Sequence, residues 1–294
     1  MRLRRLGFLC AIGAVVFSGC NSNQNLLSTT TNTSAIRFLN GSPDLGSVDV
    51  YTAAATGTPA ASGTPAASAL AYAALNSYAS FTSKAYAIVV TAAGTPSAQK
   101  LTCTLPVLSA NTRYTVVIAG KVAGATSATG LQCQIFAETV YSLPANQFQM
   151  GFHHASPALN AASMATVSFG LFSAGLNNYQ LPSNVATFQA TLTSGTGVGT
   201  AVNVLLPAVQ TAPGLGVYVA AQTGTPPASV LATTSPSQAT VGLSGATAAE
   251  NSNNFMPYTT TSGTTTTTVS SNLSVYAIDS NTNASGVQLV CAMD

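Results

Sequence analysis

Short runs that alternate apolar and polar residues follow one another along most of the chain. The clearest runs are residues 36–39, 48–51, 86–90, 100–105, 113–118 and 131–136. Turn-forming residues such as Gly94, Pro106 and Gly120 separate them. Alternation with a period of two is typical of half-buried strands, and several short strands at regular spacing predict an all-β sandwich. No stretch of ten residues after residue 20 has the apolar period of an amphipathic helix.

A related pattern begins again about a hundred residues further along. Residues 105–120 align without a gap to residues 206–221, and Asn40-Gly41-Ser42-Pro43 has a counterpart in His154-Ala155-Ser156-Pro157. Two more apolar runs follow, at residues 273–278 and 287–291, and the second of these resembles residues 131–133. A repeat of this length predicts tandem domains rather than a solenoid.

These patterns divide the chain into an export signal, a polar tether and two tandem immunoglobulin-like β-sandwich domains. The predicted boundaries are residues 1–19 for the signal, 20–34 for the tether, 35–147 for the first sandwich and 148–294 for the second. Within the second sandwich, residues 222–271 are rich in Ser and Thr and are expected to form an extended loop. Residues 53–68, which hold a direct six-residue repeat, are expected to form a loop between strands of the first.

The first twenty residues have the pattern of a secretory signal. Three arginines come first, an apolar run spans residues 6–17, and two small residues precede Cys20. The run is shorter than the ~20 residues of a membrane-spanning helix. The ending Phe17-Ser18-Gly19-Cys20 resembles the bacterial lipobox, which implies that Cys20 is acylated with fatty acids such as palmitate. Asn21 in place of Asp implies the outer membrane. An ordinary signal peptide with a nearby cysteine is the alternative.

Removal of the signal changes the charge of the protein. Three of the eight basic residues leave with it, so five basic residues remain against six acidic ones. No basic patch is left for nucleic acid. Charged residues make up 5% of the chain, against ~25% in ordinary soluble domains, so few side chains can perform acid–base chemistry. The expected partners are membrane lipid, through Cys20, and envelope glycan or protein.

The cysteines predict one disulfide. Cys10 lies in the signal and Cys20 would carry lipid, which leaves Cys103, Cys133 and Cys291 in an oxidising compartment. Cys103 and Cys133 lie in strand-like runs of one predicted domain, so we expect this pair and a buried thiol at Cys291. A bridge between Cys133 and Cys291 is the competing arrangement.

Few residues are candidates for chemistry. His153 and His154 are the only histidines, and neighbours on a strand point to opposite faces, so we do not expect them to share a metal ion. We expect His154 to form hydrogen bonds in a turn instead. Asp44 and Asp49 supply too few oxygens for Ca²⁺. We expect Asp44 to organise the turn after Pro43, and Asp49 to pair with an arginine, Arg37 or Arg113. There is no Gly-x-Ser-x-Gly motif. We therefore predict no catalytic residue, no metal and no cofactor.

The composition favours a structural, scaffolding or adhesion role over an enzyme. The alternative is a surface module that binds glycan or peptide, and five tyrosines are candidates for its platform: Tyr51, Tyr72, Tyr78, Tyr86 and Tyr114. Tyrosines in such strands more often belong to the core of the sandwich or to its edge.

Three segments resemble one bacterial family. They are Ile-Arg-Phe-Leu-Asn-Gly-Ser-Pro-Asp at residues 36–44, Val-Asp-Val-Tyr at 48–51 and Arg-Tyr-Thr-Val-Val-Ile-Ala-Gly at 113–120. In this order they resemble the DUF4397 family over residues 35–143 and, more weakly, over residues 149–221. Asn40 stands where that family has His, and Ala158 stands where it has Asp. The resemblance implies a β-rich, secreted or surface protein with tandem copies, and it brings no established activity.

Overall fold

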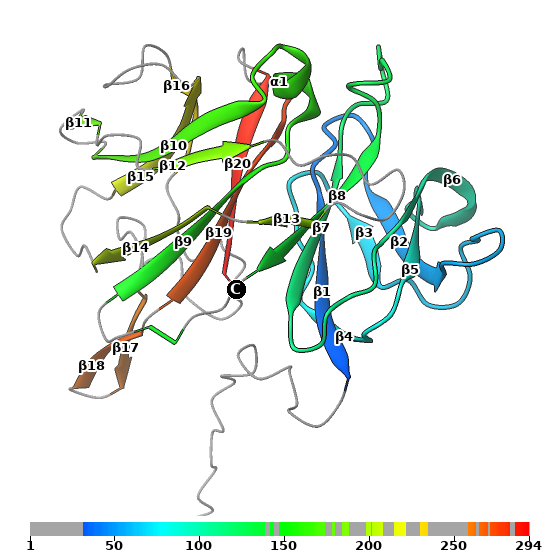
Figure 1. Cartoon of the computed structure of the whole chain (residues 1–294), viewed down its shortest axis with the longest axis horizontal. Coiled ribbons are helices and arrows are strands. Elements are labelled where there is room, and N and C mark those ends of the chain that lie inside the picture. Colours follow the sequence, from blue (N-terminus) through cyan, green and yellow to red (C-terminus); the bar gives the residue numbers. More distant parts are fainter. Residues whose placement is uncertain are drawn as a thin grey trace, which may run out of the picture.

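The structure is a computed structural model (Figure 1). It describes residues 32–138, 142–143, 147–173, 178–179, 184–187, 198–200, 202–207, 215–221, 230–234, 258–262, 265–269, 271–282 and 286–293. Almost all regular structure in these residues is β-strand, and one short helix, α1 (Pro157–Ala161), is present among them. The predicted all-β sandwich fold is therefore confirmed.

The first half of the chain folds into two sheets that face each other. Its strands are β1 (Thr33–Asn40), β2 (Val48–Ala54), β3 (Ala67–Leu70), β4 (Ala79–Thr82), β5 (Tyr86–Ala92), β6 (Thr95–Thr104), β7 (Arg113–Ala119) and β8 (Gln132–Glu138). One sheet has the order β8-β7-β1-β4 and the other has the order β3-β2-β5-β6. Strand β1 lies between β7, to which it is parallel, and β4, to which it is antiparallel.

Alternate side chains of these strands fill the space between the two sheets. Ile36, Phe38 and Val116 come from one sheet and pack with Val50 and Ile88 of the other, all with no exposed surface. This is the core that period-two alternation predicts, because every second side chain points to the same face of a sheet.

The disulfide lies inside this core. Cys103 of β6 is bonded to Cys133 of β8, with the Cα atoms 6.2 Å apart, so the bridge joins the two sheets. Cys291 is a buried free thiol, and burial raises its pKa to about 12. The expected pair is confirmed, and the competing bridge to Cys291 is not formed.

The second half repeats the strand pairings of the first. Its main strands are β9 (Gln147–His154), β10 (Thr166–Ser173), β12 (Asn184–Thr187), β14 (Val202–Pro207), β15 (Leu215–Ala221), β16 (Val230–Thr234), β19 (Ser271–Asp279) and β20 (Val287–Met293). Strand β9 lies between β19, to which it is parallel, and β14, to which it is antiparallel. Strand β10 pairs with β15 as β2 pairs with β5, and β19 pairs with β20 as β7 pairs with β8.

This connectivity corrects the expected internal alignment. Residues 105–120 include β7, whose counterpart by pairing is β19, whereas residues 206–221 include β15, whose counterpart is β5. The gapless alignment is therefore wrong as a structural equivalence. Short apolar strands preceded by Leu-Pro look alike, and the partner of a strand lies too far away in the sequence to be read from its own residues.

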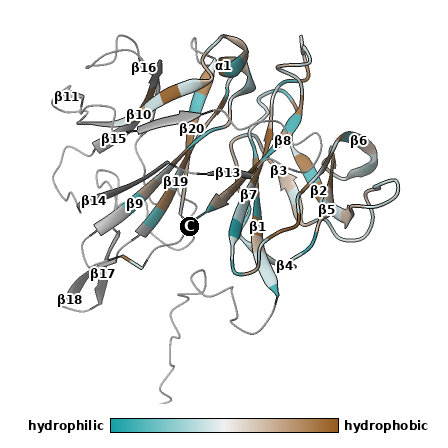
Figure 2. Ribbon diagram, in the orientation of Figure 1, coloured by the Kyte–Doolittle hydropathy of each residue, from teal (hydrophilic) through white to brown (hydrophobic). Residues whose placement is uncertain are grey.

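The two halves pack face to face through a second apolar layer. Leu39, Val117 and Phe136 point away from the first core and pack against Tyr276 and Ile278 of β19. All residues of β7 are buried as a result. On the far side of β9, the rings of Phe152 and Phe169 stack with centroids 4.9 Å apart. The sheets thus form four layers. Figure 2 shows both hydrophobic and hydrophilic stretches along the strands that it colours.

One strand of the second half crosses into the first. Strand β13 (Val198–Thr200) pairs in parallel with β8, and β14 follows it in the sheet of β9. Backbone hydrogen bonds therefore join the halves in addition to side-chain packing.

Other expectations differ in detail. Strand β1 begins at Thr33, so the end of the expected tether belongs to the fold. Residues 222–271, expected as a loop, include β16 and the hairpin of β17 (Tyr258–Ser262) and β18 (Thr265–Val269). The signal, Cys20 and the rest of the tether lie outside the described residues. Within the described part of the chain, no helix has the length and hydropathy needed to cross a membrane.

Candidate functional site

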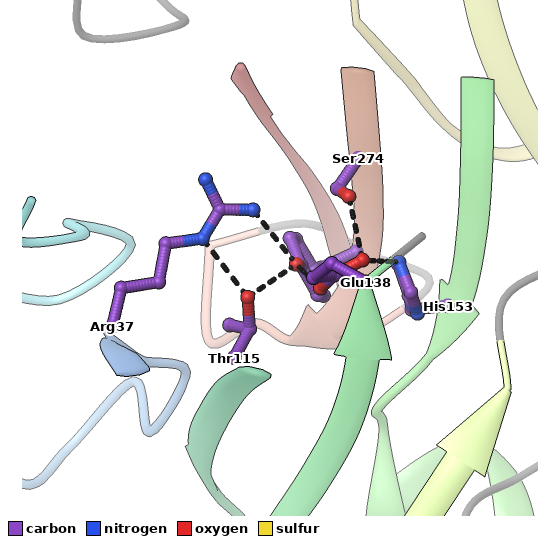
Figure 3. Close-up of polar contacts among 6 residues, drawn as sticks. Arg37, Thr115, Glu138, His153 and Ser274 are labelled. Atoms are coloured by element: carbon purple, nitrogen blue, oxygen red, sulfur yellow. Dashed lines mark hydrogen bonds and ion pairs between the residues drawn. The ribbon is translucent and has the colours of Figure 1, made fainter. Parts of the chain in front are cut away.

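A cluster of polar side chains is buried between the two inner sheets. It consists of Arg37 on β1, Thr115 on β7, Glu138 on β8, His153 on β9, and Ser274 and Tyr276 on β19 (Figure 3). None of the six is more than 5% exposed. We call this set the interface network, because its members come from both halves of the chain.

Glu138 is the centre of the network. Its Oε2 atom accepts a hydrogen bond from the Ser274 hydroxyl at 3.0 Å and lies 3.1 Å from Nε2 of His153. Its Oε1 atom accepts a hydrogen bond from the Tyr276 hydroxyl. Since these three partners all belong to the second half, the second half holds the carboxylate of the first half across the interface.

Arg37 extends the network on the side of the first half. Its Nε donates to Thr115 Oγ1 at 2.9 Å, and its Nη2 donates to the Tyr276 hydroxyl at 3.1 Å. The Tyr276 hydroxyl also lies 2.8 Å from Thr115 Oγ1. The guanidinium carbon is 4.5 Å from the centre of the Tyr78 ring, a distance at which a cation–π interaction is favourable.

The network keeps Glu138 ionised. Burial alone would raise the pKa of Glu138, but the charges of His153 and Arg37 and the hydrogen bonds from His153 and Tyr276 outweigh it. The pKa is lowered to about 2. The carboxylate is therefore negative throughout the neutral and mildly acidic range and can accept all three contacts from the second half.

Burial limits what this cluster can do chemically. A serine, a histidine and a glutamate lie together, but with exposures of 0%, 1% and 5% no substrate reaches them in this conformation. Among the described residues, no three His, Cys, Asp or Glu side chains are arranged to hold a metal ion. The arrangement instead fixes the position of the two inner sheets relative to each other.

The two Ser-Pro turns have the same hydrogen bonds at their first residue. Asn40 Oδ1 accepts from the Ser42 backbone at 3.2 Å, and Asn40 Nδ2 donates to the Gly46 carbonyl, just before β2. His154 Nδ1 faces the Ser156 backbone N–H at 3.4 Å, and His154 Nε2 lies 2.9 Å from the Met164 carbonyl, just before β10. Both side chains offer one acceptor and one donor. The expected turn role of His154 is confirmed.

An acidic side chain accepts hydrogen bonds at each turn. In the first turn the acid belongs to the turn itself, and in the second it belongs to the end of a neighbouring strand. Asp44, in the first turn, accepts backbone hydrogen bonds from Val122 at 2.9 Å and Ala123 at 2.8 Å, beyond β7. The second turn has Ala158 at that position. There the acid is Asp279 at the end of β19, which accepts from the Ser156 hydroxyl and from the Ala158 backbone at 3.1 Å. Hydrogen bonds therefore link both turns to the end of a neighbouring strand. The carboxylate that accepts them lies in the turn in the first case and on the strand end in the second.

Asp49 and Ser156 have structural partners. The expected pairing of Asp49 with an arginine is wrong, because its carboxylate accepts backbone hydrogen bonds from Ala69 and Gly94, both at 2.8 Å. The Ser156 hydroxyl donates to Asp279 and accepts from the Leu159 backbone, as the N-cap of α1. His154 contacts the backbone of Ser156 rather than its hydroxyl.

The five candidate tyrosines do not form an exposed platform. Tyr51, Tyr86 and Tyr114 are buried. Tyr72 and Tyr78 are half-buried. The Tyr72 hydroxyl donates to the Asp279 carbonyl at 2.7 Å, which adds another contact between the halves.

The family comparison covers the first sandwich and the start of the second. The model of a family described as "Domain of unknown function (DUF4397)" matches residues 34–164. A DUF4397 domain spans these residues. The match begins in β1 and ends after α1, so it contains both Ser-Pro turns. The resemblance seen in residues 36–51 and 113–120 is confirmed. A comparison with curated proteins finds no match for the chain.

Proposed function

We propose that the protein is a lipid-anchored protein of the bacterial cell envelope with a structural, scaffolding or adhesion role and no catalytic activity. The interface network is the observation that carries this proposal. It places the Ser, His and Glu side chains that resemble a reactive set inside a sealed contact between two sheets. Side chains buried in such a contact stabilise the two halves as one rigid body, which favours a structural role over catalysis.

We also infer that the second half is a divergent second copy of the DUF4397 domain. Three observations support this: the shared strand pairings, the equivalent turns at Asn40 and His154, and the equivalent hydroxyls at Thr115 and Ser274. Thr115 is opposite Arg37, three residues before Asn40, and Ser274 is opposite Gly151, three residues before His154.

The way the fold begins fits a surface tether. Twelve residues separate Cys20 from Thr33, a reach of about 40 Å when extended. Backbone hydrogen bonds fix the first residues of the fold. The Asn32 carbonyl accepts from the Ser83 backbone and the Thr33 carbonyl accepts from the Asn111 backbone, both at 2.8 Å. A fixed attachment point lets a rigid body stand off the outer membrane.

Metabolic labelling with a radioactive fatty acid tests the anchor. Cells would express the wild type, Cys20→Ala, and Cys10→Ala as a matched control within the expected signal. We expect label in the wild type and in Cys10→Ala, both in the outer-membrane fraction, and none in Cys20→Ala. Equal labelling of Cys20→Ala would refute the anchor.

A further inference from the structure

One end of the first sandwich is the place where the chain enters the fold. Strand β1 begins there at Thr33, and Figure 1 shows this start at the lower end of the first half. Twelve residues separate Thr33 from Cys20, so a lipid on Cys20 would keep this end within about 40 Å of the bilayer. We call it the entry end. A tether of this length allows the entry end either to touch the membrane or to stay clear of it.

An exposed apolar side chain lies at the entry end. The loop between β6 and β7 is fixed there, because the Asn111 N–H donates to the Thr33 carbonyl at 2.8 Å. Leu105 and Leu108 of this loop are buried in the core, whereas Val107 between them is 72% exposed. The loop therefore presents Val107 to the surroundings at a fixed position.

A positive charge lies beside this loop. Lys84 is exposed in the turn between β4 and β5, and its carbonyl accepts a hydrogen bond from the Leu108 backbone at 3.4 Å. Its Nζ atom is 5.1 Å from the centre of the Tyr86 ring, a cation–π contact that keeps the ammonium group at the entry end. The entry end thus offers an apolar and a cationic group to the same partner.

The acidic side chains of the described residues lie away from this surface. Glu138 is near the entry end, but it is buried in the interface network. Three acids lie at the opposite end, where β1 and β19 end and β2 begins: Asp44, Asp49 and Asp279. Lys121 is close to Asp279 there, and the acids outnumber it. The charges of the described residues are therefore negative at the far end and positive at the entry end.

We propose that the entry end is a membrane-contact surface, with Val107 and Lys84 resting on a bilayer that contains anionic phospholipid. The proposal rests on the lipid anchor at Cys20 proposed above. A single exposed valine is common in proteins, and one lysine attracts an anionic surface only weakly. The anchor makes such weak contacts effective, because it turns them into contacts within one molecule at a high local concentration. The acids of the far end then point away from the negative surface.

Fluorescence quenching in vesicles tests this orientation. The lipoprotein, purified from membranes with its own lipid, carries one nitrobenzoxadiazole label, either on Val107→Cys or, as the matched control, on Val122→Cys. Val122 is the other large apolar side chain exposed in the described part of the chain, and it follows β7 at the far end. The eight residues of β1 separate the two ends, so the label at residue 122 should lie about 25 Å further from the bilayer.

The vesicles contain phosphatidylglycerol and phosphatidylcholine in equal parts, with a nitroxide lipid as the quencher. We expect quenching at residue 107 to exceed that at residue 122 about threefold or more, since only the first label would touch the lipid. Lys84→Gln should lower the equilibrium constant for contact about fivefold, the effect of one lysine near an anionic surface. Lys100→Gln, which changes an exposed lysine within β6, is the matched control and should leave it unchanged.

The anchor and the contact surface fail in different ways. If the protein does not float with the vesicles in a density gradient, the anchor at Cys20 is wrong and the contact surface is overturned with it. If the protein floats, equal quenching at the two positions, or stronger quenching at residue 122, overturns the contact surface alone. Equal losses from Lys84→Gln and Lys100→Gln would do the same, and so would unchanged quenching at residue 107 in vesicles of phosphatidylcholine without anionic lipid.

Discussion

The equivalence of Asn40 and His154 makes a quantitative prediction about acid stability. His154 is fully buried, and burial is the main cause that lowers its pKa from 6.5 to about 4, against the opposing effect of the Met164 carbonyl. Protonation would also turn Nδ1, which faces the Ser156 backbone N–H, from acceptor into donor. His154→Asn supplies the acceptor and donor that Asn40 supplies in the first turn, without a group that titrates.

The sign and the size of the effect follow from linkage. The folded pKa lies below the unfolded one, so the fold prefers neutral His154. This contribution is complete above pH 6.5 and is lost as the pH falls from 6.5 towards 4. A shift of this size corresponds to about 3 kcal/mol. His154→Asn should therefore lie within about 1 kcal/mol of the wild type at pH 7 and lose about 3 kcal/mol less between pH 7 and pH 4.

Urea unfolding at several pH values between 4 and 7, followed by circular dichroism, measures this difference. Burial raises the pKa of Asp279, which also titrates, and subtracting the variant from the wild type removes its contribution. His154→Ala is the control, because it loses both turn hydrogen bonds and should be less stable at every pH. Parallel pH curves for the wild type and His154→Asn would refute the reasoning.

Two further predictions concern the interface network and the disulfide. Glu138→Gln should lower the free energy of unfolding by about 3 kcal/mol at pH 7, because the buried pair with His153 and the attraction to the charge of Arg37 are then lost. An unchanged urea midpoint would show that the network adds no stability. Cys103→Ala with Cys133→Ala should cost about 3–4 kcal/mol, since the bridge closes a 30-residue separation. Dithiothreitol should destabilise the wild type and leave this double variant unaffected; equal sensitivity would contradict the disulfide's role.

Much of the strand pattern could be predicted from the sequence, because each sandwich has a core whose residues alternate. The runs at residues 36–39, 86–90 and 113–118 became β1, β5 and β7. The disulfide also followed from local reasoning, since both cysteines lie in strands of one sandwich. The turn role of His154 needed only its place before Ser-Pro and the properties of a strand.

The interface network could not be predicted in the same way. Arg37 and Thr115 alternate with apolar residues and so have the pattern of side chains that face solvent. They are buried because β9 and β19 cover the outer face of their sheet. The contact of Glu138 with Ser274 joins residues 136 positions apart, so no local window contains both. The presence of a charge in a strand was visible, but its partner was not.

The contact between the halves uses the corresponding face of each half, yet the side chains on the two faces differ. Arg37 corresponds to Gly151, and Val117 corresponds to Tyr276, so a large side chain in one half replaces a small one in the other. Tyr276 reaches Thr115, Arg37 and Glu138 at once, which Val117 cannot do in return. Two identical first halves joined by this face would oppose two arginines at each other and lack the tyrosine. Because a buried charge without its partner is costly, the network selects pairing of the first half with the second rather than with a second copy of itself.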